Sequence, residues 1–507
     1  MSRKHWAQAA RSGSGRSSMV CNGLGGWSKV TLIDLIGHAT ARLRAYPNKP
    51  PLRQASRSEA RRIAQGKGNA QPPKHKRVPL PPGLGALRDT AAPEPTSMTE
   101  PNTLIRLRRR SLLPVIVAAQ FAGTSLWFAV NAVMPDLQRE LGVPAAAVGS
   151  LSTAIQLGFI AGTLVFALLS LADRYPPRWV FLACALLGAA CNGAVAVWPT
   201  NHLDLATVWW LRLATGFCLA GIYPVGMKIA AAWYPQGLGQ ALGWLVGALV
   251  LGTALPHGLR ALGAEWPWSQ VMLASSALAA LGGLAVWAGV PDGGDLPRAS
   301  ALQWQALRLI AFDPRLRASA LAYFGHMWEI YTLWVLVPLI LATRLQGAAL
   351  SLAAFGVIGA GAIGCVLGGR AAIRYGSARV AGIFLTVSAL CCLVAPLVLP
   401  AGNAWFALWL MVWGISVAGD SPQFSALSAG NAPREAVGSV LTLVNCIGFA
   451  ISIASIELFV HLLPQQGLGV LLPGLALGPV LGLWALRPLL ADPGAGQRPI
   501  PAASRRR

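Results

Sequence analysis

Charged residues are scarce in this chain, and acidic residues are especially few. Of 507 residues only 12% are Asp, Glu, Lys or Arg, whereas 54% are apolar, and 18 acidic residues stand against 41 Lys or Arg. A soluble domain has about 25% charged residues, and a soluble fold cannot hide this much apolar surface from water. Apolar runs of about 20 residues, long enough to cross the hydrocarbon layer of a bilayer, recur from Ser111 to Leu490. Lipid is therefore the solvent of most of this chain.

Several chemical signatures are missing as well. The motif G-x-x-x-x-G-K-[ST] of ATP-driven pumps occurs nowhere in the sequence. The eight cysteines show no zinc or redox spacing, and seven of them fall inside apolar runs. The sequence shows no clustered nucleophile and base and no complete set of metal ligands, so a membrane enzyme is disfavoured and neither a metal nor a cofactor is expected. A transport-inactive sensor is also disfavoured, because no soluble signalling domain follows the last run.

The first hundred residues differ from the rest. Residues 1–97 hold 17 Lys or Arg against 4 Asp or Glu and are rich in Ser, Gly and Pro. This composition predicts a basic, disordered extension over residues 1–100, and a disordered basic tail is expected over residues 491–507. Met98 opens a segment with a basic flank before the first apolar run, so we expect translation to begin there. The basic run PPKHKRVP could contact nucleic acid or anionic lipid, but we interpret it as solvated charge and expect no nucleic-acid partner.

Twelve apolar runs predict an all-α integral membrane fold. Near-continuous apolarity over about 20 residues favours helices over the alternating ten-residue strands of a membrane barrel. The flanks and loops on one side hold 16 Lys or Arg and those on the other hold 3, which predicts that both termini are cytoplasmic. The runs lie near Leu112 to Met134, Val148 to Leu171, Trp179 to Val197, Leu205 to Ala230, Leu238 to Leu259, Val271 to Val290, Ala318 to Thr343, Ser351 to Gly369, Val380 to Leu399, Ala404 to Phe424, Val437 to His461 and Leu468 to Leu486.

The second half of the chain repeats features of the first. LAGIYPVGMKIAA, starting at Leu219, aligns with VAGDSPQFSALSA, starting at Val417, at an offset of 198 residues. A basic turn after the second run and a Phe and Pro in the first run recur at offsets of 200 and 203. Such parallel repeats, with a binding site between them at mid-membrane, are a transporter architecture. We expect a six-helix bundle over residues 101–290, a cytoplasmic linker over residues 291–317 and a second six-helix bundle over residues 318–490.

The loop after the second run resembles the major facilitator superfamily, and the resemblance covers about Leu104 to Leu490. The family pattern is G-x-L-A-D-R-x-G-R-R, and LLSLADRYPPRW supplies the Leu-Ala-Asp-Arg core and a later arginine. The second copy, GRAAIRYGSAR, has Ile373 in place of the acid. In the family this loop is a conformational latch, and an acid and an arginine at helix ends can pair across two halves and separate when the halves rock. The alternative is a general anchor of basic residues. The resemblance assigns the latch to Asp173, Arg174, Arg178 and Arg374.

Three other family patterns narrow the type of transporter. WLRLATGF in the fourth run supplies the Arg212 and Gly216 of R-x-x-Q-G and has Thr215 at the Gln position, and an arginine inside a span is expected to face a cavity or a partner. GWLVGALVLG in the fifth run lacks the proline of the antiporter motif, which weakens a drug-efflux interpretation. The arginines with which nitrate and nitrite porters hold their anion in the second and eighth spans are absent, so nitrate is disfavoured.

The resemblance implies that the first, fourth, seventh and tenth spans line a central cavity. In the seventh, AYFGHMWEIYTLW places His326 and Glu329 on neighbouring positions of one helical face. An ionised carboxyl is costly at mid-membrane, so Glu329 is a proton-carrier candidate, and a structural carboxyl bonded to a neighbouring helix is the alternative. Metal binding by this pair is disfavoured, because two ligands do not make a site. In the first span Gln120, Thr124, Trp127 and Asn131 share one helical face and are expected to form a polar stripe along the cavity. The other candidates for a solute or proton pathway are Arg212, Tyr223, Lys228, Trp334 and Asp420.

The functional expectation combines the repeat with these candidates. Lys228 and Asp420 lie at similar depth, so an ion pair between the halves is geometrically allowed. We expect a monomeric secondary transporter that moves a small solute, with a small organic anion as one candidate, across a bacterial inner membrane by alternating access. Arg212, Glu329, Asp420 and His326 are expected to couple the solute to protons. The alternative within the same fold is an efflux pump for drugs or metabolites.

Overall fold

The computed structural model describes residues 100–144, 146–199, 202–234, 238–292 and 302–491. All of them belong to one compact unit, Pro93–Arg507. The predicted terminal disorder and the expected start at Met98 lie outside the described residues, apart from the single positions Glu100 and Ala491. Every regular element in the described part is a helix, and eleven helical segments are long and apolar enough to cross a membrane. A shorter apolar helix, Leu112–Thr124, contributes to the first span, so the all-α membrane fold is confirmed.

Two of the first six spans are interrupted. The first span is divided into three helices and the fourth into two, because the chain leaves helical geometry between them. Their bounds are α2 (Glu100–Thr124), α3 (Ala129–Ala132), α4 (Met134–Leu141), α5 (Ala147–Leu168), α6 (Leu171–Arg174), α7 (Pro177–Val197), α8 (Leu205–Leu219), α9 (Tyr223–Trp233), α10 (Leu238–Leu262) and α11 (Trp268–Gly289).

The last six spans follow a short connecting helix. The tenth and twelfth are each divided into two helices, whereas the seventh, eighth, ninth and eleventh are continuous. The bounds are α12 (Ala306–Phe312), α13 (Pro314–Ala342), α14 (Gly347–Tyr375), α15 (Ser377–Val398), α16 (Asn403–Gly419), α17 (Ser421–Asn431), α18 (Val437–Gln466), α19 (Leu468–Gly474) and α20 (Leu477–Ala491).

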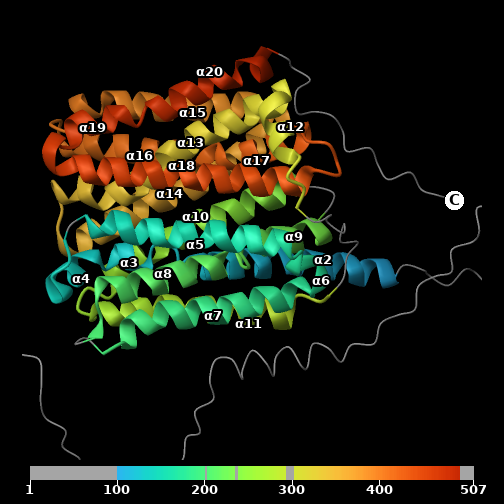
Figure 1. Cartoon of the computed structure of the whole chain (residues 1–507), viewed down its shortest axis with the longest axis horizontal. Helices are drawn as coiled ribbons and strands as arrows, with labels where there is room; N and C mark the ends of the chain where they lie inside the picture. The colour runs from blue at the N-terminus through green and yellow to red at the C-terminus, as the bar shows by residue number, and fades with distance from the viewer. Residues whose placement is uncertain (1–99, 145, 200–201, 235–237, 293–301, 492–507) are drawn as a thin grey trace, which may run out of the picture. The chain divides into compact units, whose positions relative to one another are not determined.

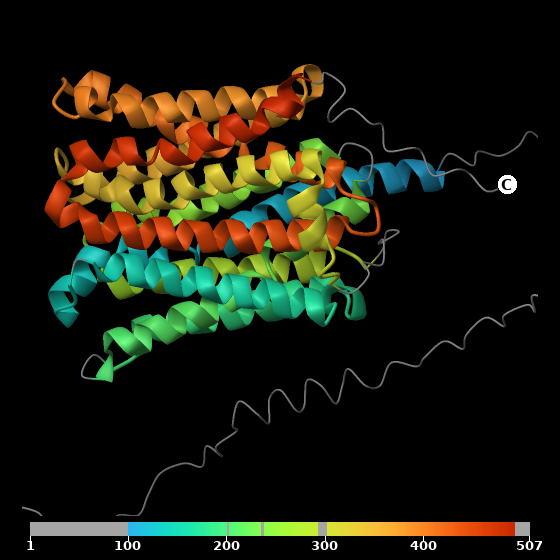
Figure 2. The same cartoon turned by 45° about the horizontal axis from the view of Figure 1, so that its top comes forward.

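The long helices lie side by side along one direction (Figures 1 and 2). In Figure 1 the helices of the first half, blue to yellow-green, gather below those of the second half, yellow to red. The halves meet where α10 packs on α14 and where α5 packs on α18. Figure 1 also shows α4 and α19 at one end of the bundle and α6, α9 and α12 at the other, and we call these the α4 end and the α6 end.

The segments that the repeat aligns have the same structure in both halves. Helix α9 begins at Tyr223 and α17 begins at Ser421, which is the predicted offset of 198 residues, and both helices are 11 residues long. Pro224 and Pro422 each occupy the second position of their helix. Proline is tolerated there because the first N–H groups of a helix have no partner within it. The break in the fourth and tenth spans is therefore built into the repeat.

The first span of each half, in contrast, differs. Residues between Ser125 and Phe128 form a turn that separates α2 from α3, whereas α13 runs without interruption for 29 residues. The two prolines that the repeat aligns therefore occupy different positions. Pro135 is the second residue of helix α4, whereas Pro338 lies inside the continuous helix α13. A second difference follows α5, where Ser170 adopts a positive φ of 49° and starts α6.

Candidate functional site

A cavity lies between the halves, beside the middle of α13. Residues of α9 and α10 from the first half and of α13, α17 and α18 from the second half line it. Water molecules can occupy about 40 Å³ of it, room for roughly three. Among the described residues of the lining, none is Asp, Glu, Lys or Arg. The aromatic lining consists of Tyr223, Tyr323, Tyr331, Trp334 and Phe449, and the polar lining also includes His326, Ser421, Ser425 and Asn445.

Three residues form a chain of polar contacts in the cavity wall. His326 Nε2 lies 2.8 Å from Ser421 Oγ, and His326 Nδ1 lies 2.9 Å from Asp420 Oδ1. His326 and Ser421 line the cavity, whereas Asp420 lies behind them with 1% of its side chain exposed. Asp420 occupies the break between α16 and α17, where the N–H groups of the α17 N-terminus favour a negative charge. From the cavity, a proton therefore meets His326 before it reaches Asp420.

A second polar contact joins α13 to α18 across the cavity floor. The hydroxyl of Tyr323 donates to Asn445 Oδ1 at 2.8 Å, so the Asn445 amide group is left with its N–H donors for other partners. Neither Asn445 nor Ser421 was among the residues predicted from the sequence. The available signals were that Asn445 is the only Asn in the eleventh apolar run and that Ser421 directly follows an intramembrane acid.

Glu329 lies outside the cavity, in the interior of the second half. Its Oε1 accepts hydrogen bonds from Ser388 Oγ at 2.5 Å, Trp413 Nε1 at 2.6 Å and Cys392 Sγ at 3.2 Å, which belong to α15 and α16. Only 1% of the residue is exposed. A step of three residues turns about 300° around a helix, so His326 and Glu329 share an edge of α13 yet face different neighbours. Its role as a proton carrier stays a prediction.

Arg212 also lies outside the cavity, fully buried in α8. Its guanidinium donates to the carbonyl oxygens of Leu126, at 2.9 Å, and Trp127, and it lies 3.4 Å from Asn192 Oδ1. Both carbonyls belong to the turn that interrupts the first span, where no helical N–H reaches them. Within the described part of the chain no carboxylate pairs with this guanidinium. Arg212 thus replaces the backbone donors that the turn removes.

The four polar candidates of the first span do not form one stripe along the cavity. Gln120 is fully buried, packs against α9 and lies before the turn, and the hydroxyl of Thr124 donates to the Gln120 carbonyl at 2.8 Å. Beyond the turn, the Asn131 amide donates to Ser152 Oγ of α5 at 2.9 Å. The helical face that the sequence predicted assumes a continuous helix, and the turn at Trp127 redirects the residues beyond it.

Aromatic side chains close the cavity on the side nearer the α4 end. Trp127 stacks on Tyr331 and Phe449 with ring centroids 5.8 Å and 5.5 Å apart. Trp334 meets Tyr331 edge-on at 5.2 Å and Phe128 at 6.1 Å. Trp127 and Phe128 come from the turn of the first span, so residues of both halves build this layer. Trp127 is therefore a cover of the cavity and not part of its lining.

Hydrogen bonds also hold the halves together where α5 meets α18. The Thr153 hydroxyl donates to Glu457 Oε1 at 2.5 Å, and the Ser452 hydroxyl donates to Gln156 Oε1 at 2.8 Å. Each bond joins a residue of the first half to one of the second. We call these two bonds the α5–α18 seam.

Two of the four residues assigned to the latch, Asp173 and Arg178, form ion pairs in this conformation, and neither pair reaches the second half. Lys228 Nζ lies 2.5 Å from Asp173 Oδ1, and Arg178 lies 2.6 Å from Asp292. The ion pair between Lys228 and Asp420 that the sequence allowed is wrong, because Lys228 reaches the loop after α5 instead. Arg174 is exposed, and in the second half the Arg374 guanidinium lies over the Tyr375 ring, 5.4 Å from its centre.

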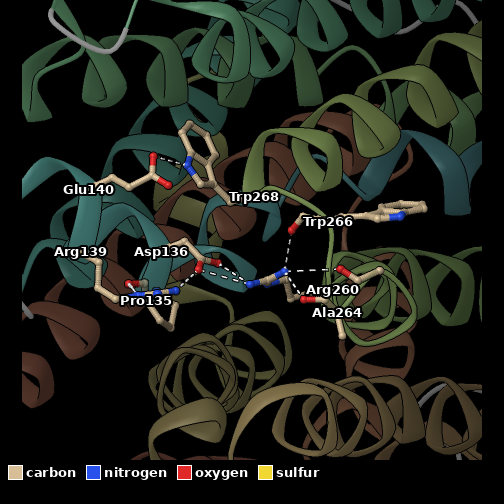
Figure 3. A network of polar contacts seen from close by, with 9 residues as sticks. Pro135, Asp136, Arg139, Glu140, Arg260, Ala264, Trp266 and Trp268 are labelled. Carbon is tan, nitrogen blue, oxygen red and sulfur yellow. Dashed lines mark hydrogen bonds and ion pairs between the residues drawn. The ribbon is translucent and has the colours of Figure 1, made fainter.

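A polar network at the α4 end fixes the outer part of the first span (Figure 3). Arg260, near the end of α10, lies 3.1 Å from Asp136 of α4 and donates to the carbonyl of Trp266 at 3.0 Å. The Trp268 indole N–H donates to Glu140 at 2.7 Å. These contacts tie α4 to the connection between α10 and α11. No sequence pattern indicates them, since each residue lies in a short loop or helix end.

The sequence matches a known family over most of its length. The family profile described as Major Facilitator Superfamily matches residues 116–456. The chain is 27% identical over 205 residues to a putative uncharacterized transporter of Escherichia coli K12, YgaY, which is 38% of this chain and 48% of that protein. It is 28% identical over 164 residues to the 4-hydroxybenzoate transporter PcaK of Pseudomonas putida, 32% of this chain and 36% of that protein. The matched part of the chain thus spans about half or less of the length of these relatives.

Solved structures share the fold at low sequence identity. The human organic anion transporter MFSD10 has a TM-score of 0.57 at 16% identity and covers 75% of this chain and 99% of its own. The proton:xylose symporter XylE has a TM-score of 0.61 at 13% identity, with 77% of this chain and 96% of its own covered. The nucleoside transporter NupG has a TM-score of 0.57 at 13% identity, with 75% and 100% covered. Together with a family profile that runs from the first span into the eleventh, these findings show that the chain belongs to the Major Facilitator Superfamily.

Proposed function

We propose that this protein is a secondary active transporter that moves a small organic solute through the cavity between its halves by alternating access. The observation that carries the proposal is the cavity itself, because both halves line it and the His326–Asp420 pair stands in its wall. The family and the neighbouring structures are transporters, and their names include carriers of 4-hydroxybenzoate, xylose and nucleosides. Such a cavity at mid-depth between parallel repeats is the site that this architecture uses.

The lining supports a solute with at most one negative charge. Arg212 and Lys228, the cations expected to attract an anion, are bonded to the first span and to Asp173. Among the described residues of the lining, His326 is then the only one that can carry a positive charge, and a cationic solute would meet no carboxylate there. Aromatic walls favour a flat ring, since ring pairs contribute about 0.5–1.5 kcal/mol beyond burial. A small organic monoanion, aromatic by preference, fits this chemistry.

The coupling step follows from the order of the three polar groups. A proton entering from the cavity reaches His326, whose other nitrogen faces Asp420. Protonated His326 attracts the solute anion, and Asp420 compensates the charge of the imidazolium while the cavity is closed. Release of the solute then leaves a proton that can return to the solution on the other side. Coupling therefore depends on the pair and not on either residue alone.

The membrane and the orientation are part of the proposal. The excess of 16 Lys or Arg over 3 supports a cytoplasmic location for both termini, which puts the α6 end in the cytoplasm. The curated relatives are bacterial, which supports the inner membrane of a bacterium. We also propose that one chain is sufficient for transport, because the cavity is completed by the two halves of a single chain.

The test uses purified protein in liposomes with an imposed pH gradient. Uptake of labelled solute is measured for a panel that contains benzoate, 4-hydroxybenzoate, cyclohexanecarboxylate, acetate, benzylamine and xylose, because one proton moved with one monoanion carries no net charge. We expect gradient-driven uptake of at least one aromatic monocarboxylate, weaker uptake of the aliphatic acids and none of benzylamine. Absence of gradient-driven uptake of every member of the panel, in protein that retains its melting transition, would contradict the proposal.

A further inference from the structure

A shallow pocket opens where the two halves meet near the α6 end. Helix α10 of the first half and α14 of the second half form its walls, and it is separate from the central cavity. The Arg370 guanidinium lies over the Trp244 ring, with its central carbon 6.0 Å from the ring centroid. The lining residues are Gln240, Gly243 and Trp244 from α10 and Val366, Gly369 and Arg370 from α14.

Arg370 has no carboxylate partner among the described residues, and it is exposed. Trp244 is 39% exposed, so the ring contacts the surroundings of the bundle and not only its interior. Arg370 precedes the end of α14 at Tyr375 by five residues, a rise of about 7.5 Å along the helix. Arginine and tryptophan at this distance from a helix end lie at the boundary between lipid headgroups and acyl chains. The pocket thus presents an uncompensated positive charge at headgroup level.

An apolar stripe leads from this pocket toward the middle of the membrane. Ile363 and Leu367 of α14 are 52% and 50% exposed, and with Arg370 they follow the helical spacing of four and three residues. The spacing puts all three side chains on one face. The surface therefore offers a cation at the headgroup level and two apolar side chains below it, in the order in which a phospholipid presents its phosphate and its acyl chain.

We propose that this pocket binds an anionic phospholipid, with the phosphate on Arg370 and an acyl chain along Ile363 and Leu367. Basic pockets between transmembrane helices bind acidic headgroups for the same reason, since the charge of the lipid replaces the missing protein counter-ion. Trp244 and Gln240 complete the headgroup site from the other half. Because both halves contribute, the bound lipid favours the arrangement in which α10 and α14 are adjacent. The site does not depend on which solute the central cavity carries.

Native mass spectrometry of the purified full-length protein tests the proposal. The protein in detergent is titrated with palmitoyl-oleoyl phosphatidylglycerol or with the matching phosphatidylcholine, and the dissociation constants of the first bound lipid are compared. We expect phosphatidylglycerol to bind more tightly, and Arg370→Gln to weaken its binding about fivefold while phosphatidylcholine is unaffected. Arg370→Lys keeps the charge and is expected to retain most of the preference.

Arg379→Gln is the matched control, because Arg379 is an exposed arginine at the same end of the bundle that does not line the pocket. We expect it to leave phosphatidylglycerol binding unchanged and Trp244→Leu to weaken it less than Arg370→Gln. Equal binding of the two lipids to the wild type would overturn the proposal. So would equal losses in Arg370→Gln and Arg379→Gln, or displacement of phosphatidylglycerol by millimolar inorganic phosphate, which would identify a site for soluble anions.

Discussion

The two halves of this transporter share a repeated sequence but use their buried charges differently. In the first half, Arg212 is bonded to backbone carbonyls of the first span and Lys228 to Asp173. In the second half, His326 lines the central cavity and Asp420 stands directly behind it. A charged residue inside a span is therefore not a transport group by position alone. Its partner decides whether it supports the fold or faces the solute.

The difference follows from how the first span of each half is built. The turn at residues 125–128 exposes carbonyl oxygens that need donors, and in a lipid environment only another protein group can supply them. Arg212 is that donor, so its charge is committed to the backbone. Helix α13 has no such turn, and its polar side chains remain available for the cavity and for the interior of the second half. The asymmetry of the charges thus originates in the backbone.

The comparison between the halves predicts the largest loss of transport for a substitution of Asp420. Asp420→Asn removes the charge beside His326 but keeps the shape of the side chain, so a protonated imidazole loses its counter-ion. We expect uptake driven by a pH gradient to fall by about two orders of magnitude in liposomes, as for loss of other proton-transfer groups. An unchanged initial rate at the same amount of folded protein would remove Asp420 from coupling.

A substitution of Arg212 tests whether this buried charge of the first half stabilises the fold. Arg212→Leu leaves the carbonyls of Leu126 and Trp127 without donors, and each unpaired buried group costs about 1–3 kcal/mol. We expect a loss of about 2–4 kcal/mol in the free energy of unfolding, measured by thermal unfolding in detergent. Arg212→Lys should lose less, because it keeps a donor but not the fork that reaches two carbonyls. Full stability with lost transport would instead assign Arg212 to the pathway.

Much of the architecture could be predicted from the sequence, because lipid enforces long apolar helices and duplication leaves a constant offset. The repeat aligned the segment from Leu219 with the segment from Val417, and the structure has helices that start at the equivalent residues Tyr223 and Ser421. The turn in the first span could not be predicted, since the sequence SLWF contains neither Gly nor Pro. The prediction of one helical face assumed a continuous first span. Because of the turn, Gln120, Thr124 and Asn131 do not lie along one stripe of the cavity.

The candidate site was only partly indicated by the sequence. An intramembrane acid and a histidine are rare in lipid, which singled out Asp420 and His326, but the same signal also singled out Glu329, which lies outside the cavity. Periodicity does not tell which neighbour a side chain meets, so it grouped Glu329 with His326 although three residues of α15 and α16 surround its carboxyl. Asn445 and Phe449 reach the cavity from the eleventh span, which only tertiary packing reveals.

A substitution of Glu329 tests whether a buried acid of the second half that does not line the cavity contributes to transport. Glu329→Gln keeps an oxygen that can accept from Ser388, Trp413 and Cys392, so the local packing is preserved. We expect the rate of gradient-driven uptake to change by less than about threefold, since the residue does not face the cavity. The assay is the one used for Asp420→Asn. A loss as large as in that variant would support the sequence-based prediction that Glu329 carries protons.

The smallest effect is expected at the α5–α18 seam. Thr153→Val removes the hydroxyl that donates to Glu457 and keeps the size of the side chain. One such bond is worth about 1 kcal/mol, so the population in which α5 and α18 are adjacent should fall by about fivefold relative to the open one. Accessibility of a cysteine placed at position 149, which Val460 and Glu457 cover, reports this change. Identical labelling rates with and without the Thr153 hydroxyl would show that the seam does not hold the halves together.

Solute counterflow in the Asp420→Asn variant tests the central claim most directly. Liposomes loaded with unlabelled solute take up labelled solute by exchange, which requires the cavity to alternate but needs no net movement of protons. We expect Asp420→Asn to retain counterflow while a pH gradient no longer drives accumulation, because the cavity is intact and the proton pair is not. Accumulation driven by the pH gradient at the wild-type level in this variant would contradict the proposed coupling.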